Sequence, residues 1–566
     1  MTDATETPPH EPVAPAGATS ASSPASSPSS PLDGPGDIVW DDPKHAEHTW
    51  EWDDMHTPRA LARLEAEYAR ILAKGEGYRA RRHDLPVCFL VKVVNGYAYW
   101  TFYLDVGDED KEATEARAAA SRKAEVGLVG RWWSERARPE LEAMYREIDA
   151  LPADDAGPAE LADAWNRAWA LAERAWEIHF LAIVGPYQAL DDLVDFVKPL
   201  VQGITDAEIL ALTSGEIDEL ARVEAGLDAL ASRAAAKPDL AAFLRRVPSP
   251  SLGELRAHPN GAALAESVES FLIEHGHLGH VSEDLGEPSW IADPCRLLAD
   301  IGMRQTRDEA AAKERRDRRA AETQAVLDRI RSALVERPTE LEEFERLVAA
   351  ARAVGWLTEG HNYWIDRMCG DRLRRFTRRI GARLVAAGAI DDPEDVRHFE
   401  RAEVDALLRA PADRRALVAE RSAEHARQSV ISPPRIIGAP KNADPSEEDR
   451  FDGARYTTTD ASVLRGTGAS AGIVRAVARV VVGPADFERV RPGDIVVARA
   501  SNPGWVPLFT IAGGFVTDTG GVLSHAAVVA REFGVPAVVG TGDATSRIAD
   551  GRIIEIDGTT GYVRIG

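Results

Sequence analysis

The chain has 566 residues, a length that predicts two or three domains rather than one small core. Hydrophobic residues make up 44% and charged residues 28%, a composition typical of a soluble globular protein. The formal net charge of -25 disfavours nucleic acid and anionic membranes as partners, because an acidic surface repels both.

The three cysteines, Cys88, Cys295 and Cys369, lie far apart without a CxxC spacing. This pattern disfavours a disulfide framework or a structural zinc site and indicates a reducing compartment. No apolar run reaches the length of a membrane helix, and the N-terminus lacks the basic and apolar regions of a signal peptide. We therefore expect a cytoplasmic protein.

Composition divides the chain into four parts. Residues 1–37 are rich in Pro, Ser, Ala and Thr, which predicts a disordered tail. Residues 38–425 follow a mostly helical pattern, and residues 426–464 contain the prolines and acidic residues of a linker. Residues 465–566 alternate short β-branched runs with Gly and Asp turns. The predicted fold is multidomain: a largely α-helical domain followed by a compact α/β domain.

Three local features stand out in the helical part. The segment TPRALARLEAEYARILAKG predicts a helix that ends at Gly75. The β-branched and aromatic runs on either side of Asn95 and Gly96 predict a hairpin. Residues 160–197 form a long apolar pattern whose aromatic side chains suggest a buried core or a pocket wall.

The sharpest chemical signal is FVTDTGGVLSHAAVVAREFGVPAVVG, residues 515–540. A short strand runs into two glycines, Ser524 is predicted to cap a helix that begins at His525, and Gly534 to end it. The free N–H groups and the dipole of a helix start favour an anion. Since a neutral imidazole attacks phosphorus without a metal, His525 is predicted to carry a phosphoryl group. The alternative is an ordinary histidine in a helix cap.

This segment resembles the swivelling phosphohistidine domain of phosphoenolpyruvate-utilising enzymes, a group that includes pyruvate phosphate dikinase, phosphoenolpyruvate synthase and rifampin phosphotransferase. The resemblance covers residues 465–566, and the Gly-Gly, Ser-His-Ala and Gly-Val-Pro-Ala blocks occur in the family's order. It implies that His525 is the catalytic phosphohistidine. Candidate supports of the phosphoryl site are Thr517, Thr519, Gly520, Gly521, Ser524 and Arg531. Turn chemistry for the threonines, and a surface ion pair for the arginine, are the alternatives.

Three upstream segments resemble the acceptor-binding domain of rifampin phosphotransferases: WEWDDMHTPRALARL, SFLIEHGHLGHVSEDLGEPSWIADP and EGHNYWIDRMCGDRLRRFTRRIG. Their aromatic, imidazole and carboxylate groups suit a pocket that orients and deprotonates a hydroxyl. The candidate acceptor-binding residues are Trp50, Trp52, Asp53, His56, His275, His277, His361 and Tyr363. Core packing and ordinary loop histidines are the alternatives. The histidine spacing in EHGHLGH is not that of a zinc helix, so no metal site is predicted.

Full-length members of the family also carry an ATP-grasp domain, and many carry a phosphoenolpyruvate-binding barrel. The sequence shows no Gly-rich phosphate loop after a strand, and no barrel follows the histidine domain. The resemblance therefore implies a split, dikinase-type enzyme: a separate ATP-grasp subunit binds ATP and Mg²⁺ and phosphorylates His525, which swings to the acceptor.

This organisation resembles phenylphosphate synthase and the cresol-type aryl phosphate synthase of aromatic degradation, whose acceptor is a phenolic hydroxyl. We therefore expect a heteromeric complex and a small phenolic substrate. Two alternatives stay open. One is a phosphotransferase that acts on an antibiotic or another natural product, and the other is a non-catalytic phosphohistidine regulatory protein.

Overall fold

The computed structural model describes most of the chain. The described residues are 38–54, 56–82, 85–105, 110–153, 155–213, 218–246, 248–279, 285–305, 309–439, 460, 462–501 and 505–566. The predicted tail (1–37) lies outside this set, as do residues 440–459 and 461 of the predicted linker. The structure is multidomain and largely helical with two β-sheets. This part of the predicted fold class is confirmed.

Helices make up most of the chain before residue 429. The helices and helical turns of this part are η1 (Pro43–Glu47), α1 (Arg63–Ala69), α2 (Ile71–Arg82), α3 (Lys111–Trp132), η3 (Trp133–Ala137), α4 (Arg138–Ala150), α5 (Pro158–Val197), α6 (Asp206–Ala211), α7 (Asp218–Ala235), α8 (Pro238–Leu244), α9 (Leu252–Ala257), α10 (Ala262–His275), α11 (Pro294–Arg304), α12 (Glu309–Leu334), α13 (Pro338–Val354), α14 (Leu357–His361), η4 (Asn362–Arg367), α15 (Met368–Ala386), η5 (Pro393–His398), α16 (Arg401–Arg409) and α17 (Arg415–Gln428). They enclose one large apolar core, and α7 to α11 enclose a smaller one. Among the described helices, none is both long and apolar enough to cross a membrane.

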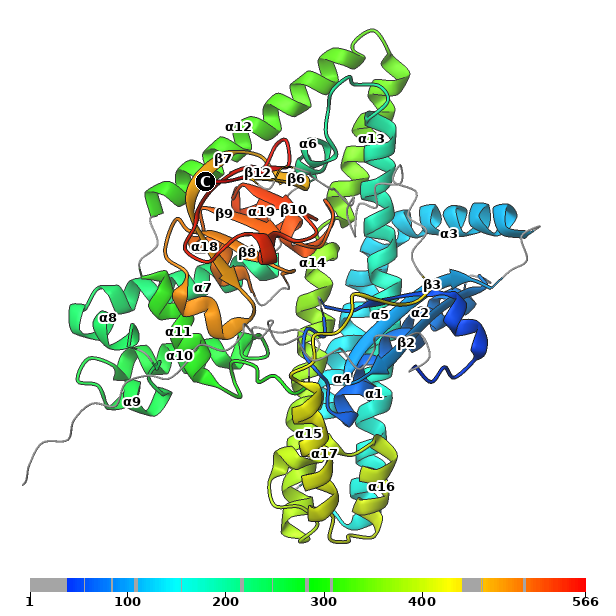
Figure 1. Cartoon of the computed structure of the whole chain (residues 1–566), viewed down its shortest axis with the longest axis vertical. Helices are drawn as coiled ribbons and strands as arrows, with labels where there is room; N and C mark the ends of the chain where they lie inside the picture. The colour runs from blue at the N-terminus through cyan, green and yellow to red at the C-terminus, as the bar shows by residue number, and fades with distance from the viewer. Residues whose placement is uncertain are drawn as a thin grey trace, which may run out of the picture.

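The central helix of this part is α5, which runs for 40 residues and continues past Pro186 (Figure 1). Alanine occupies many of its buried positions, so neighbouring helices can approach its backbone closely. Trp165, Trp169 and Trp176 are almost completely buried along it. The prediction that this aromatic region forms a core is confirmed, and Trp176 also lines a cavity described below.

Helix α2 differs from its predicted boundary. The sequence predicts a helix end at Gly75, whereas α2 continues to Arg82. A Cβ atom at Gly75 would lie 2.5 Å from the carbonyl oxygen of Trp176 and 2.8 Å from the Phe180 ring. The glycine therefore lets α2 approach α5 closely, rather than ending the helix.

A four-stranded antiparallel sheet covers one side of the helical core. Its strands are β1 (Thr49–Trp52), β2 (Val87–Val94), β3 (Tyr97–Leu104) and β4 (Ile436–Gly438), in the order β2-β3-β1-β4. Asn95 and Gly96 both have positive φ, 48° and 82°, as a tight two-residue hairpin turn requires. The predicted hairpin is confirmed.

The start of the predicted linker is built into the helical part. Helix α17 extends to Gln428, and β4 pairs with β1 along Ile436–Gly438. Residues 426–428 are therefore helix, and residues 436–438 are a strand whose backbone hydrogen bonds are satisfied by pairing with β1. We call residues 38–439 the helical part and residues 462–566 the C-terminal domain.

The C-terminal domain is a compact α/β unit. Its elements are β5 (Val463–Arg465), β6 (Thr467–Ser470), β7 (Ile473–Val481), η6 (Pro484–Arg489), β8 (Ile495–Ala498), α18 (Val506–Ile511), β9 (Gly514–Thr517), α19 (His525–Phe533), β10 (Ala537–Val539), α20 (Ala544–Arg547), β11 (Ile553–Asp557) and β12 (Tyr562–Ile565). The eight strands have the order β5-β12-β11-β7-β8-β9-β10-β6, with β7 to β10 parallel. Helices α18 and α19 pack on one face in an apolar core.

The C-terminal domain is docked on the helical part. In Figure 1 it lies between α12 and the α7 to α11 helices, beside α14. Val522 and Leu523, in the loop before α19, pack into the large helical core. Arg319 of α12 forms an ion pair of 3.1 Å with Glu532 of α19. The loop that carries His525 is therefore held against the helical part.

We expect Gly75→Ala to destabilise the protein by about 1–3 kcal/mol, because the added methyl group would force α2 away from α5. Gly127→Ala is the matched control. A Cβ atom there meets nothing within 4 Å, so that substitution in helix α3 should stabilise by up to about 1 kcal/mol. Denaturant titrations followed by circular dichroism measure both changes, and equal effects would contradict the close-approach role of Gly75.

Candidate active site

His525 lies where a parallel strand ends and a helix begins. Strand β9 ends at Thr517, and α19 starts at His525 after a turn in which Gly520 has a φ of 100°. Ser524 is the N-cap residue, but its side chain makes no capping hydrogen bond, which differs from the predicted cap. Its hydroxyl is buried without a hydrogen-bond partner among the described residues, so it is available to an incoming group. Gly534 ends the helix in the left-handed conformation, as predicted.

The imidazole of His525 contacts the helical part directly. Its Nδ1 atom lies 2.9 Å from Oε2 of Glu359 in α14, and the ring is almost completely buried. A carboxylate in this position accepts a hydrogen bond from Nδ1–H, which leaves the lone pair on Nε2. The Nε2 atom is buried and has no partner among the described residues. Glu359 therefore favours the tautomer in which Nε2 carries the lone pair.

His525 and Glu359 line a small cavity of about 50 Å³ together with Arg367. Burial lowers the pKa of Arg367 to about 10, so the guanidinium stays charged at neutral pH. Its Nε and Nη2 atoms are buried and have no partners within the described parts of the chain. An anion on the imidazole would meet these unused donors and the positive end of α19.

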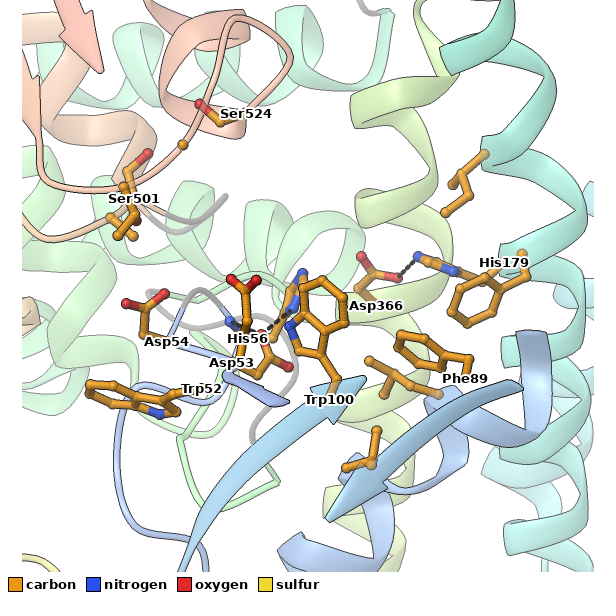
Figure 2. Close-up of a pocket in the computed structure, with 18 of the residues that line it drawn as sticks. Trp52, Asp53, Asp54, His56, Phe89, Trp100, His179, Asp366, Ser501 and Ser524 are labelled. Carbon is orange, nitrogen blue, oxygen red and sulfur yellow. Dashed lines mark hydrogen bonds and ion pairs between the residues drawn. The ribbon is translucent and has the colours of Figure 1, made fainter. Parts of the chain in front are cut away.

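A larger cavity of about 260 Å³ lies between the helical part and the C-terminal domain (Figure 2). Its aromatic walls come from β1, the hairpin and α5. They are Trp52, Phe89, Trp100, Trp176, Phe180 and Tyr187. The C-terminal domain contributes Ser501, Gly520, Ser524 and Ala526. Both sequence neighbours of His525 thus line the larger cavity, while His525 itself lines the smaller one.

One polar group in the larger cavity is the pair formed by Asp53 and His56. The Nδ1 atom of His56 lies 2.7 Å from Oδ1 of Asp53. The carboxylate favours the tautomer with a proton on Nδ1, so Nε2 of His56 carries the basic lone pair. This pair is suited to accept a proton from a hydroxyl group.

A second polar contact joins the two domains at the rim of this cavity. Arg499 of the C-terminal domain lies 2.5 Å from Oδ2 of Asp54, and its guanidinium stacks over the Trp52 ring at 4.1 Å. Burial raises the pKa of the Asp54 carboxyl, and the charge of Arg499 opposes that rise. Together with the ion pair between Arg319 and Glu532, the contacts at Glu359 and Asp54 give three charged contacts between the described parts of the two domains.

A third polar group lies at the buried end of the larger cavity. His179 of α5, His361 of α14 and Asp366 of η4 place their donor atoms within 4.8 Å of one another. Burial holds the pKa of His179 well below its usual range, so this imidazole is neutral. These three are the group of described residues that could hold a metal ion.

The predicted acceptor-binding residues fall into three places. Trp52, Asp53, His56 and His361 line the larger cavity, and Tyr363 lines the smaller one. Trp50, His275 and His277 line neither. Trp50 donates from its indole to the carbonyl oxygen of His45, and His275 and His277 pack against Tyr363. For these three residues the structure favours the core-packing alternative.

Most of the predicted phosphoryl-site supports shape the turn before α19. The hydroxyl of Thr517 donates to the carbonyl oxygen of Thr519, whose hydroxyl donates to that of Arg499. The carbonyl oxygen of Gly521 accepts from the Ser524 backbone. Arg531 is buried and donates to the carbonyl oxygen of Ala469, away from both cavities, so it pairs with neither predicted partner.

Four residues at the site were not predicted from the sequence: His179, Asp366, Arg367 and Arg499. Glu359 belongs to the segment EGHNYW, which the sequence does indicate as a candidate pocket wall. Asp366 could not be predicted from helical periodicity, because an α-helix places residues 361 and 366 on different faces. The π-helical turn η4 brings them to the same face, since its hydrogen bonds join residues five apart.

The fold and the site together define a class of domain: a small α/β unit that presents a buried histidine at a helix start to a neighbouring helical domain. Comparison with known proteins agrees. Residues 490–561 match the model described as "PEP-utilising enzyme, mobile domain", and residues 191–359 match "Rifampicin phosphotransferase fourth domain". The matches confirm the predicted resemblance to phosphoenolpyruvate-utilising enzymes and to rifampin phosphotransferase.

Curated relatives match longer stretches. A chondramide synthase of Chondromyces crocatus is 30% identical over 93% of this chain and 14% of its own length. An uncharacterized phosphotransferase of Bacillus subtilis, YvkC, is 28% identical over 75% of this chain and 51% of its own length. A rifampicin phosphotransferase of a Streptomyces species is 32% identical over 58% of this chain and 38% of its own length. The chain thus spans about half of the length of YvkC, less than half of the rifampicin phosphotransferase and a small part of the chondramide synthase.

Arg499→Ala should loosen the docking of the C-terminal domain by about 1–3 kcal/mol, because it removes an ion pair and a cation–π contact. We expect faster hydrogen exchange around residues 522–525 and a larger radius of gyration in X-ray scattering. Arg479→Ala is the matched control, since Arg479 pairs with Asp494 inside the C-terminal domain. Unchanged exchange in Arg499→Ala would contradict this role.

Proposed function

We propose that this chain is the acceptor-binding and phosphohistidine part of a dikinase-type phosphotransferase. His525 takes a phosphoryl group that originates from ATP and passes it to the hydroxyl of a small phenolic compound. The observation that carries the proposal is the docked His525, whose tautomer is held by Glu359 beside a buried arginine and an aromatic cavity.

The transfer step uses groups that are already in place. The bond between phosphorus and Nε2 of His525 breaks, and a bond forms between phosphorus and the acceptor oxygen. Because Glu359 keeps the proton on Nδ1, the ring leaves as a neutral imidazole. Arg367 and the start of α19 stabilise the charge on the phosphoryl oxygens. The proton of the acceptor hydroxyl passes to Nε2 of His56.

The size of the larger cavity supports a small acceptor. A cavity of about 150 Å³ suffices to hold benzene. The 260 Å³ between the docked domains therefore suits a compound of one or two rings. Its aromatic walls favour a flat ring. A phenol, with a pKa of about 10, needs only modest help from a base such as His56.

A natural product is the second candidate acceptor. The names of two relatives, a rifampicin phosphotransferase and a chondramide synthase, support this alternative. A large acceptor would require the C-terminal domain to dock less closely, because the cavity in the docked state is small. The choice between the two acceptor classes is therefore open to direct test.

The proposed donor site lies outside this sequence. We propose a separate ATP-grasp chain that binds ATP and Mg²⁺ and phosphorylates His525 when the C-terminal domain has swung away from the helical part. Swinging is required because His525 is buried in the docked state.

Chemical phosphorylation tests the acceptor half without the donor chain. We expect phosphoramidate to charge His525 of the full chain, giving a product that is labile in acid and stable in base. Addition of phenol or cresol should then discharge the protein to an aryl phosphate, measured by ³¹P NMR. His525→Ala should give no aryl phosphate, and the matched control His398→Gln, a buried histidine remote from both cavities, should behave as wild type.

The outcomes separate the alternatives. Discharge by rifamycin-sized compounds but not by phenols would favour the natural-product acceptor. A stable phosphohistidine that no hydroxyl compound discharges would favour the regulatory alternative. Labelling of His525 by ATP and Mg²⁺ in the purified chain alone would contradict the separate donor.

Glu359→Gln should slow phosphoryl transfer from His525 to the acceptor by about 100-fold or more, because a neutral amide accepts from Nδ1–H more weakly than a carboxylate and can instead donate to Nδ1, which favours the other tautomer. Single-turnover discharge of the chemically phosphorylated protein measures this rate. Glu403→Gln is the control for loss of an ion-paired carboxylate outside the site, and it should keep the wild-type rate. An equal rate in Glu359→Gln would contradict the tautomer argument.

A further inference from the structure

The cluster of His179, His361 and Asp366 has the geometry of an open metal site. Nε2 of His179 lies 3.5 Å from Oδ1 of Asp366, and Nε2 of His361 lies 3.7 Å from Oδ2. A tetrahedral ion with bonds of about 2.0–2.1 Å holds its donors roughly 3.3 Å apart. The donor atoms of the three residues lie within 4.8 Å of one another, so side-chain movements of about an ångström would bring them to ligand positions.

The second observation is a set of unused polar atoms inside the cluster. Oδ1 of Asp366 and Nδ1 of His179 are buried and have no hydrogen-bond partner among the described residues. Asp366 is only 1% exposed. A buried carboxylate oxygen without a partner is costly, because it has lost water and gained nothing in return. A bound cation would satisfy it.

The hydrogen bonding of His361 also suits a ligand. Its Nδ1 atom lies 2.6 Å from the carbonyl oxygen of Leu357, one helical turn earlier. A carbonyl accepts, so Nδ1 carries the proton and Nε2 presents its lone pair toward Asp366. Metal-binding histidines are commonly oriented by such a bond from the other ring nitrogen.

The donors come from three neighbouring elements of the helical part. His179 lies on the buried face of α5, His361 is the last residue of α14, and Asp366 lies in the π-helical turn η4, where residues five apart share a face.

We propose that His179, His361 and Asp366 bind a divalent transition-metal ion, of the kind represented by Zn²⁺ or Co²⁺, at the buried end of the larger cavity. Two imidazoles and one carboxylate leave positions open for a further ligand. Imidazole ligands disfavour Mg²⁺, so this ion is distinct from the Mg²⁺ that accompanies ATP.

The position of the site indicates a role, which rests on the proposed function. All three ligands line the cavity proposed to hold the acceptor. An ion there would bind the acceptor oxygen and lower the pKa of its hydroxyl, in addition to the base His56. Metal binding itself requires neither phosphoryl donor nor acceptor, so it can be tested independently of phosphoryl transfer.

Titration of the metal-free full chain with Co²⁺ tests the site. We expect one equivalent to bind, with the visible absorption bands of Co²⁺ ligated by imidazole, and Zn²⁺ but not Mg²⁺ to displace it. His179→Gln, His361→Gln and Asp366→Asn should each weaken binding by at least about 100-fold. His398→Gln, which alters a buried histidine outside the cluster, should bind as wild type.

Thermal melts provide a second measurement. Zn²⁺ should raise the melting temperature of the wild type and of His398→Gln but not of the three ligand variants. Saturable binding that survives in the ligand variants, or no one-to-one binding by the wild type, would overturn the proposal. If a ligand variant fails to fold, the Co²⁺ spectrum of the wild type tests the proposal by itself. A spectrum without the bands of imidazole ligation would also overturn the proposed site. If the protein binds the metal ion but forms no aryl phosphate, the metal-site proposal stands and the proposed acceptor chemistry is contradicted.

Discussion

The hydrogen bond between His525 and Glu359 is the contact on which the arrangement of the site depends. It joins the first residue of α19 to α14, and so connects the C-terminal domain to the helical part at the reacting atom. It also selects the tautomer of the ring. A single carboxylate therefore bears on both where the histidine lies and which ring nitrogen keeps its lone pair, and both cavities adjoin that point.

Docking through this contact must be reversible if His525 is charged elsewhere. The charged contacts across the boundary are Glu359 with His525, Asp54 with Arg499 and Arg319 with Glu532, and Val522 and Leu523 add apolar burial. Phosphorylation would add about two negative charges beside Glu359. Arg367, with its unused donors, and the start of α19 offset that charge, so the docked state can accept the phosphorylated histidine.

The sequence predicted local features better than contacts between distant segments. The hairpin at Asn95 and Gly96, the helix start at His525 and its end at Gly534 depend on neighbouring residues alone, and each was found. Gly75 was misinterpreted, because its role depends on α5, about a hundred residues away in the sequence. The predicted linker begins too early in the chain, because β4 is only three residues long and forms by pairing with β1, which is far away in the sequence.

The same distinction explains the candidate site. The histidine motif is contiguous, so the place of His525 at a helix start could be predicted from neighbouring residues, whereas the larger cavity is assembled from β1, the hairpin, α5, α14 and the C-terminal domain. The segment from Leu357 to Arg367 shows why helical periodicity could not predict the cavity. Glu359 and Arg367 line the small cavity with His525, while His361 and Asp366 line the large one. The π-helical turn shifts the register after His361, so one short segment contributes to both cavities. Such bulges are frequent at functional sites, and this one divides the residues that would stabilise a phosphoryl group from those that would hold its acceptor.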